Sequence, residues 1–112
     1  MQVIFESPDP QAAVLRTLTV RRVRQAFKRL AWLTPRVSVH LSDINGPRGG
    51  IDKRCQIELL TDGDNPIVVT SLARDWLTAL QSALARAARS LLHNMNRRRQ
   101  PRSNSLRLPA IH

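Results

Sequence analysis

The sequence lacks several features that mark common classes of protein. Its single cysteine can form neither an internal disulfide nor a cysteine-rich zinc site. No apolar run approaches the roughly 18 residues of a membrane span, which excludes a transmembrane protein. The first residues have no basic segment followed by an apolar one, so we expect no secretory signal. The 112 residues suffice for one domain, which we expect in the reducing cytoplasm with no membrane partner.

Residues that support catalysis or cofactor binding are also scarce. The chain has no tyrosine and only two phenylalanines, too few for an aromatic platform on which splayed bases stack. His40, His93 and His112 are far apart and match no metal-binding spacing. No Ser/His/Asp or Cys/His arrangement follows from the spacing, and Cys55 falls on the inward phase of a predicted strand, as a buried thiol does. We therefore expect no enzyme, no metal, no cofactor and no small-molecule substrate.

Acidic residues are the third shortage. Eight Asp and Glu stand against 18 Lys and Arg, which gives a net charge of +10. Residues 21–36 hold six bases and no acid, residues 76–112 hold seven arginines and no acid, and the rest of the chain is slightly acidic. A surface that is basic only for solubility does not require its bases to be gathered into separate blocks. A surface that binds a polyanion does require this. Because arginine also forks onto phosphate, nucleic acid is the favoured partner.

The N-terminal third of the chain predicts a strand followed by a helix. Alternation at residues 3–5 indicates the strand. Asp9 suits the N-cap and Pro10 the first position of a helix, which we expect to continue to about Leu33 and to be ended by Pro35. Helical spacing places on its inner side Ala13, Val20, Val23, Phe27 and Leu30.

The remainder of the chain predicts three strands and a second helix. The strands are indicated by alternating apolar residues at 37–41, 55–59 and 67–70. A glycine-rich loop separates the first two, and a hairpin loop separates the last two. Asp75 is placed to open a helix from Trp76 to Asn96. Its inner face would carry Leu80, Ala83, Leu84, Ala87 and Leu91.

The order β-α-β-β-β-α predicts an α+β fold. Three strands in series form an antiparallel meander and the first strand joins it, which gives a four-stranded, mostly antiparallel sheet. Both helices should pack on its apolar face, with Trp32 and Trp76 in the core. We assign residues 1–96 to this domain and residues 97–112 to a flexible basic tail. The opposite sheet face should be polar, with Ser38, His40, Gln56, Glu58 and Thr70.

The candidate binding residues are the bases of the two charged blocks. They are Arg21, Arg22, Lys28 and Arg29 on the first helix, Arg86, Arg89, Arg97, Arg98 and Arg99 on or after the second, and Arg48 and Lys53 near the glycine-rich loop. On a helical projection, Arg22 and Arg29 lie opposite the apolar stripe. Ordinary outer helix faces mix charges of both signs, but no acid occurs between Asp9 and Asp43. The loop at residues 46–50 matches neither the Walker pattern nor the dinucleotide-binding fingerprint, so a simple connection between strands explains it at least as well as a phosphate cradle does.

These elements and charges resemble the family of ribosome hibernation-promoting factor and ribosome-associated inhibitor A. Residues 1–3 are similar to the first strand of that family, and residues 15–30 are similar to its basic first helix. Residues 75–89 are similar to its second helix, where an acid opens the helix and bases recur at the positions of Arg86 and Arg89.

The resemblance spans about residues 1–99 and implies a fold like the double-stranded RNA-binding domain with an additional strand. It implies a non-enzymatic inhibitor that binds rRNA in the tRNA and mRNA channel of the small ribosomal subunit and silences idle ribosomes in a bacterial stress response. The helix bases and Arg97 to Arg99 would contact that rRNA. The glycine-rich loop is longer than we expect in the short inhibitors, so the resemblance by itself implies no contact from this loop. The sequence has no counterpart of the C-terminal domain with which long members pair ribosomes, so we expect a short-form member.

Two other functions fit the same charge pattern. A general binder of structured RNA or duplex DNA would share the electrostatics and differ in its target. A protein-interaction or membrane-surface module would instead use the polar sheet face or the basic tail. Ready displacement of the protein from small subunits by bulk duplex would favour the general binder. Subunit binding that survives charge reversal of Arg86 and Arg89 would favour the interaction module.

Overall fold

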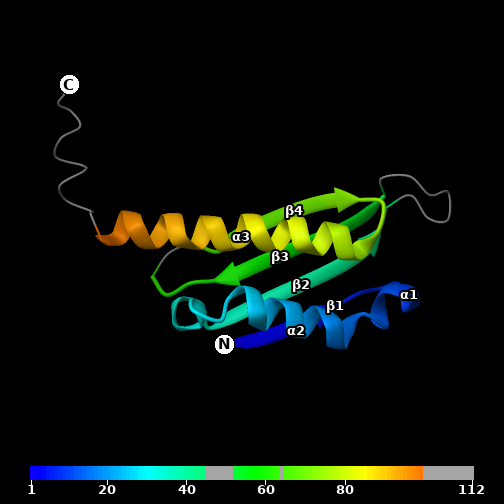
Figure 1. The fold of residues 1–112 in the computed structure, drawn as a ribbon, viewed down its shortest axis with the longest axis horizontal. Helices are drawn as coiled ribbons and strands as arrows, with labels where there is room; N and C mark the ends of the chain where they lie inside the picture. The colour runs from blue at the N-terminus through cyan, green and yellow to red at the C-terminus, as the bar shows by residue number, and fades with distance from the viewer. Residues whose placement is uncertain (45–51, 64, 100–112) are drawn as a thin grey trace, which may run out of the picture.

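The strands and helical regions that the sequence predicts are present, with changed bounds (Figure 1). The computed structural model describes residues 1–44, 52–63 and 65–99. In chain order the elements are β1 (Gln2–Glu6), α1 (Pro10–Ala13), α2 (Arg16–Ala26), the 3-10 turn η1 (Ala31–Leu33), β2 (Arg36–Asp43), β3 (Lys53–Leu60), β4 (Ile67–Ala73) and α3 (Trp76–Arg99).

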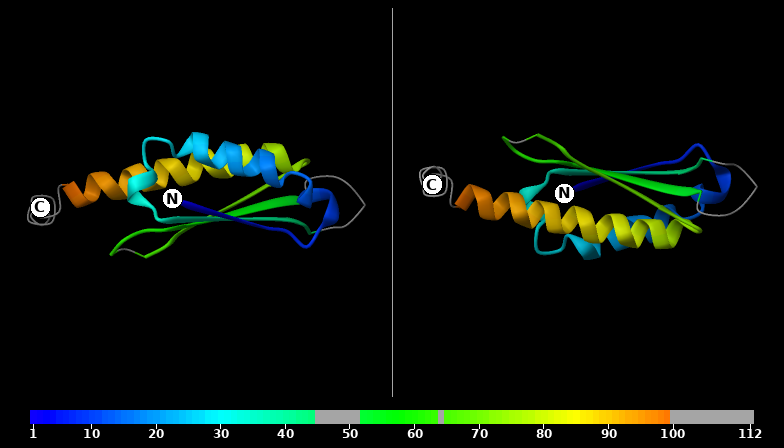
Figure 2. Two further views of the ribbon diagram at one scale, coloured as in Figure 1. Left: turned by 90° about the horizontal axis from the view of Figure 1, so that it is seen from below. Right: turned by 90° about the horizontal axis from the view of Figure 1, so that it is seen from above.

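The strands form one sheet in the order β1-β2-β3-β4. β1 pairs with β2 in parallel, because the chain crosses over through α1 and α2 between them, and the other two pairings are antiparallel. Both views of Figure 2 show α2 and α3 on the same face of the sheet, with the other face open. The predicted α+β class, with a mostly antiparallel sheet and its helices on one face, is confirmed.

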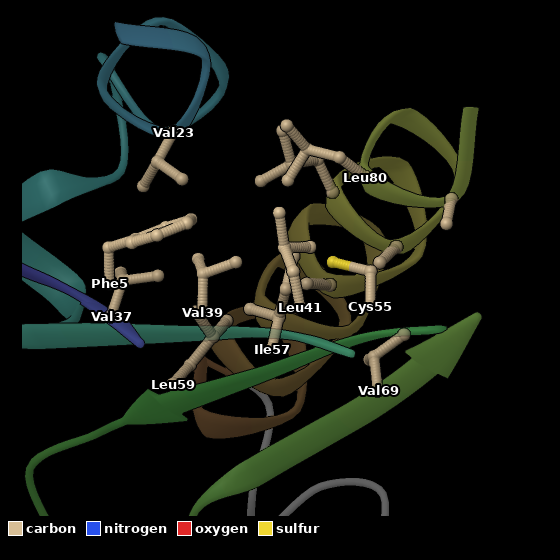
Figure 3. Close-up of a cluster of buried hydrophobic side chains, with 14 of the residues drawn as sticks. Phe5, Val23, Val37, Val39, Leu41, Cys55, Ile57, Leu59, Val69 and Leu80 are labelled. Carbon is tan, nitrogen blue, oxygen red and sulfur yellow. The ribbon is translucent and has the colours of Figure 1, made fainter. Parts of the chain in front are cut away.

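The core lies between the sheet and these two helices. Alternate residues of β2 and β3 face it and are buried: Val37, Val39, Leu41, Cys55, Ile57 and Leu59. In Figure 3, Val23 of α2 and Leu80 of α3 approach these strand residues from the opposite side. The predicted inner residues of α3 are all buried, and so is Trp76, whose indole N–H donates to the carbonyl oxygen of Ser42 at 3.0 Å. This packing fixes which faces of the two helices remain in solvent.

The first helical region differs most from its prediction. Asp9 caps α1 as expected, but within α1 it is Ala12 and not Ala13 that is buried. The helix does not continue to Leu33: the helical region breaks after α1, and α2 ends well before that residue. Pro35 therefore does not end the helix, and it lies directly before β2.

Tight turns replace the end of the predicted helix. The N–H of Leu30 donates to the carbonyl oxygen of Phe27, and the N–H of Leu33 donates to that of Leu30, each at 2.9 Å. The N–H of Phe27 still donates to the carbonyl oxygen of Val23 at 3.1 Å, so Phe27 keeps the helical phase of α2 and is fully buried although it lies past that helix. The new direction of the chain leaves Trp32 71% exposed, and its predicted place in the core is wrong.

α3 is a helix of 24 residues that begins behind an acidic cap. One carboxylate oxygen of Asp75 accepts the N–H of Thr78 at 2.7 Å and the other accepts its hydroxyl at 3.0 Å, and these bonds lower the pKa of the carboxyl. The helix continues past its predicted end at Asn96, so residues 97–99, which we assigned to the tail, are helical backbone. The rest of the predicted tail, residues 100–112, lies outside the described residues.

Candidate nucleic-acid interface

The bases of α2 are arranged around a packed side that differs from the predicted stripe. Thr19 and Val23 are buried at its centre. Arg21 and Arg24 are exposed on the opposite side. Arg22, predicted to lie opposite the stripe, is only partly exposed and lies at the flank of the packed side. The projection was wrong here because it counted only apolar residues as inner, whereas the polar Thr19 is buried and rotates the packed side.

A groove joins the end of the first basic block to α3. Lys28 and Arg29 were predicted on the helix, but they lie exposed in the turns that follow α2. With Leu30 they form one wall of a groove of about 360 Å³, and Ala88 and Leu92 of α3 form the facing wall. The groove therefore combines two cationic side chains with an apolar lining, where two segments far apart in the sequence meet.

Arg86 and Arg89 extend the basic surface along α3. Both are exposed, and their spacing places them about one helical turn apart. Arg86 leans toward β4, and its Nη1 donates to the carbonyl oxygen of Thr70 at 2.8 Å. Arg97, Arg98 and Arg99 belong to the last turns of α3, which reach past the end of the sheet in Figure 1.

Within the described residues, no acid forms an ion pair with the helix bases Arg21, Arg22, Arg86 and Arg89 or with Lys28 and Arg29. The ion pairs found there join Lys53 to Asp43 at 2.9 Å and to Asp52 at 3.2 Å. This cluster lies at the end of the sheet where α3 begins, whereas the groove lies beside the C-terminal half of α3 (Figure 1). The positive potential of the helix bases is therefore open to an anionic partner.

Lys53, predicted as a loop contact, is engaged in its own network. It lies directly across the β2–β3 pairing from Asp43, and its Nζ is 5.2 Å from the centre of the Trp76 ring. The hydrogen bond to Asp43 is the main cause that raises the pKa of Lys53, with a smaller contribution from the buried Asp52. Two carboxylates and a ring already stabilise this ammonium group, so we leave it out of the interface. Arg48 lies outside the described residues.

Two exposed residues were not selected from the sequence as candidate contacts. Arg24 lies on the outer side of α2, and its Nη1 donates to the carbonyl oxygen of Met1 at 3.3 Å. Its place in an acid-free block was a sufficient signal to include it. Trp32 follows the groove wall in the chain, and no local signal in the sequence distinguishes it from a core tryptophan.

The open face of the sheet does not share this charge. A shallow depression of about 290 Å³ on it is lined by Glu6, Ser38, Val39, His40, Arg54, Gln56 and Glu58. Val68 and Leu72 on the same face are 54% and 49% exposed, so the prediction of a polar face is correct only in part. Because acids and bases are mixed on this face, it is a poorer surface for a polyanion than the helices are.

Other kinds of site find little support among the described residues. Cys55 is fully buried as predicted, and burial raises the pKa of its thiol to about 12, which suppresses the reactive thiolate. The described part of the chain has no group of three or more His, Cys, Asp or Glu placed to hold a metal ion. No helix in that part has both the length and the hydropathy to cross a bilayer.

Solved structures share this fold, although no family model and no curated protein matches the sequence. A ribosomal subunit interface protein from Coxiella burnetii matches with a TM-score of 0.69 at 13% identity, over 86% of this chain and 99% of that chain. The N-terminal domain of Protein Y from Thermus thermophilus matches with a TM-score of 0.53 at 18% identity, over 80% of this chain and 91% of that chain. This chain therefore has the fold of a ribosomal subunit interface protein.

Proposed function

We propose that this protein is a ribosome-associated, non-enzymatic inhibitor of translation that acts in the cytoplasm as a hibernation factor. It would bind rRNA of the small ribosomal subunit in the channel that tRNA and messenger RNA use. The chief support is the groove in which Lys28 and Arg29 face α3, since neither base is paired with an acid within the described residues. The shared fold with a ribosomal subunit interface protein favours the ribosome over other polyanions.

The groove and its surroundings suit the RNA backbone. Lys28 would act as a point charge on a phosphate, and Arg29 would hold a phosphate through two parallel hydrogen bonds. The exposed Arg21 of α2 and Arg89 of α3 would add further phosphate contacts. Each neutralised phosphate releases counterions, so binding should weaken steeply as salt rises. Residues 97–99 would extend the contact beyond the sheet.

The proposed inhibition needs no chemical step. A folded domain in the channel would exclude tRNA and messenger RNA by its volume alone. Buried Val23 and Leu80 hold α2 and α3 against the same sheet, so the backbones that carry the bases are fixed before binding. Such preorganisation lowers the entropy lost on association.

Sedimentation with purified small subunits tests this proposal. The wild-type protein should move with the subunits at low salt and leave them as salt is raised. Arg29→Glu should lower the salt concentration at which it leaves. Arg74→Glu is the matched control, because it makes the same charge change at an exposed residue near the start of α3, away from the groove. A wild-type protein that stays at the top of the gradient at moderate salt would overturn the proposal.

A general binder of structured RNA is the second candidate, because phosphates like those the groove would hold occur in every RNA. Competition separates the two. Bulk duplex RNA should displace the protein from small subunits poorly if the ribosome is its target. Displacement at an equal concentration of nucleotides would favour the general binder.

A further inference from the structure

The two tryptophans of this chain lie in opposite surroundings. Trp76 is 8% exposed and its indole N–H is hydrogen-bonded, whereas Trp32 is 71% exposed. A tryptophan side chain gains a large hydrophobic free energy from burial, and a tryptophan left mostly in water forgoes it. Trp32 is therefore a candidate for contact with a binding partner.

The backbone turn that carries Trp32 is held in place by hydrogen bonds and by buried neighbours. The N–H of Leu33 donates to Leu30 at 2.9 Å, which closes the turn that carries Trp32. Before this turn Phe27 is fully buried, and after it Thr34 is fully buried. The Thr34 hydroxyl donates to the carbonyl oxygen of Leu60 at 2.6 Å and so ties the turn to β3. An aromatic ring on such a base loses little backbone entropy when it meets a partner.

The charges around Trp32 indicate the class of partner. Lys28 and Arg29 precede it in the same set of turns, and Arg36 follows it at the start of β2. All of these bases are exposed, and no acid occurs between Asp9 and Asp43 in the sequence. A ring among cations complements a single-stranded nucleic acid, which presents a base face and a phosphate in each nucleotide. An acidic protein surface would match the cations, but unlike a nucleic acid it does not place a planar ring beside every negative charge.

We propose that Trp32 stacks on an unpaired base of the bound RNA, beside the phosphates that Lys28 and Arg29 hold. This inference rests on the proposed function and refines it, because it names an unpaired nucleotide as part of the target. Bases inside a regular duplex are stacked on one another and offer no free face, so the contact requires a loop, a bulge or a single strand. The ring gives affinity for such a nucleotide without reading its identity.

Binding of two short RNAs by Trp32 variants tests the inference. One RNA is a hairpin with an unpaired loop, and the other is a blunt duplex of similar charge. Trp32→Ala should weaken binding of the hairpin about tenfold and leave the duplex nearly unchanged, since base–aromatic stacking contributes about that much. Trp32→Phe should keep most of the affinity, while Trp32→Leu, apolar but not aromatic, should lose it. The salt dependence should be the same for all of them, because no phosphate contact changes.

Two results would overturn the stacking contact. One is equal affinity of Trp32→Ala and wild type for the hairpin. The other is full retention of binding by Trp32→Leu, which would indicate a simple apolar contact. Because Trp32 is exposed, none of these variants should lower the urea midpoint of unfolding appreciably, which separates binding from folding.

Sedimentation of the same variants with small subunits separates this inference from the proposed function. If wild type binds the hairpin through Trp32 but does not sediment with subunits, the ribosomal role fails and the stacking contact stands. If Trp32→Ala sediments like wild type and binds the hairpin equally well, the ribosomal role stands and the contact fails. Loss of subunit binding with unchanged affinity for the hairpin would indicate a ribosomal protein as the partner of Trp32 and would refute the inference.

Discussion

Arg86 of α3 donates a hydrogen bond from Nη1 to the carbonyl oxygen of Thr70 in β4, at 2.8 Å. The same nitrogen lies 3.2 Å from the hydroxyl oxygen of Ser71, which donates in turn to the hydroxyl of Ser82 at 3.1 Å. β4 is an edge strand of the sheet, and a charged side chain over such an edge blocks pairing with another chain. A base that we predict to contact RNA therefore also ties α3 to the sheet.

Arg86→Ala should consequently affect folding as well as binding. We expect a loss of about 0.5–1 kcal/mol in the free energy of unfolding, toward the lower end because the side chain is exposed. The free energy of unfolding of Arg89→Ala should stay within about 0.5 kcal/mol of the wild-type value, because Arg89 forms no comparable hydrogen bond to β4 within the described residues. Urea unfolding of both variants measures the difference. Equal midpoints for the two would show that the tie contributes nothing in solution.

Lys28→Ala and Arg29→Ala should change the salt dependence of RNA binding. Each removes a proposed phosphate contact, so the slope of log affinity against log salt should become shallower by about 0.7–0.9. Arg74→Ala removes the same charge at a residue that lies away from the groove. It should lower the affinity slightly at every salt concentration and change the slope little. Titrations at several salt concentrations provide the slopes. Unchanged slopes for both groove variants would show that neither residue holds a phosphate.

The cap at Asp75 should make stability depend on pH on the acid side. Its folded-state pKa lies below the ordinary value, mainly through the hydrogen bond from the Thr78 N–H. The stabilisation is therefore complete above the pKa of the unfolded chain, about 3.9, and is lost as pH falls through the lower folded value. Asp75→Asn can still cap the helix but cannot titrate, so it should be less sensitive to acid, whereas Asp75→Ala should be less stable at neutral pH also. Urea midpoints between neutral and acidic pH measure both effects.

The thiol of Cys55 should be inert in the folded protein and should affect stability on the alkaline side. Burial raises its pKa to about 12, against about 8.5 in an unfolded chain. Its contribution is therefore fully present below the unfolded pKa and declines as pH rises toward the folded value, because only the unfolded thiol ionises there. A thiol reagent at mildly alkaline pH should react rapidly only in denaturant. Fast reaction of the native protein would contradict the buried position, and Cys55→Ala provides the blank.

The sequence pattern predicted local structure correctly where a single chemical rule was sufficient. Alternation placed β2 and β3 correctly, because only one face of each strand is covered by helices. Asp9 and Asp75 were identified as helix-opening residues because their side chains satisfy free N–H groups of the first turn wherever the helix lies. Of the candidate contacts chosen from the charge blocks, Arg21, Arg86 and Arg89 are exposed, as a contact residue must be.

Lys53 shows what pattern could not predict. Its sequence neighbours suggested a loop base free to meet a partner. The β2–β3 register sets it opposite Asp43, and that pairing depends on two strands joined by a long connection. The parallel position of β1 beside β2 is likewise a product of how the helices cover the sheet, and the sequence left it open.

The chemistry of neighbouring residues was enough to predict the strands, the starts of α1 and α3, and the division of charge into two basic blocks. The end of α2, the exposure of Trp32 and the meeting of Lys28 and Arg29 with α3 in one groove depend instead on packing across the whole fold. The spacing of Val23, Phe27 and Leu30 fits a helix and a series of tight turns equally well. The choice between them came from packing against a sheet built of residues distant in the sequence.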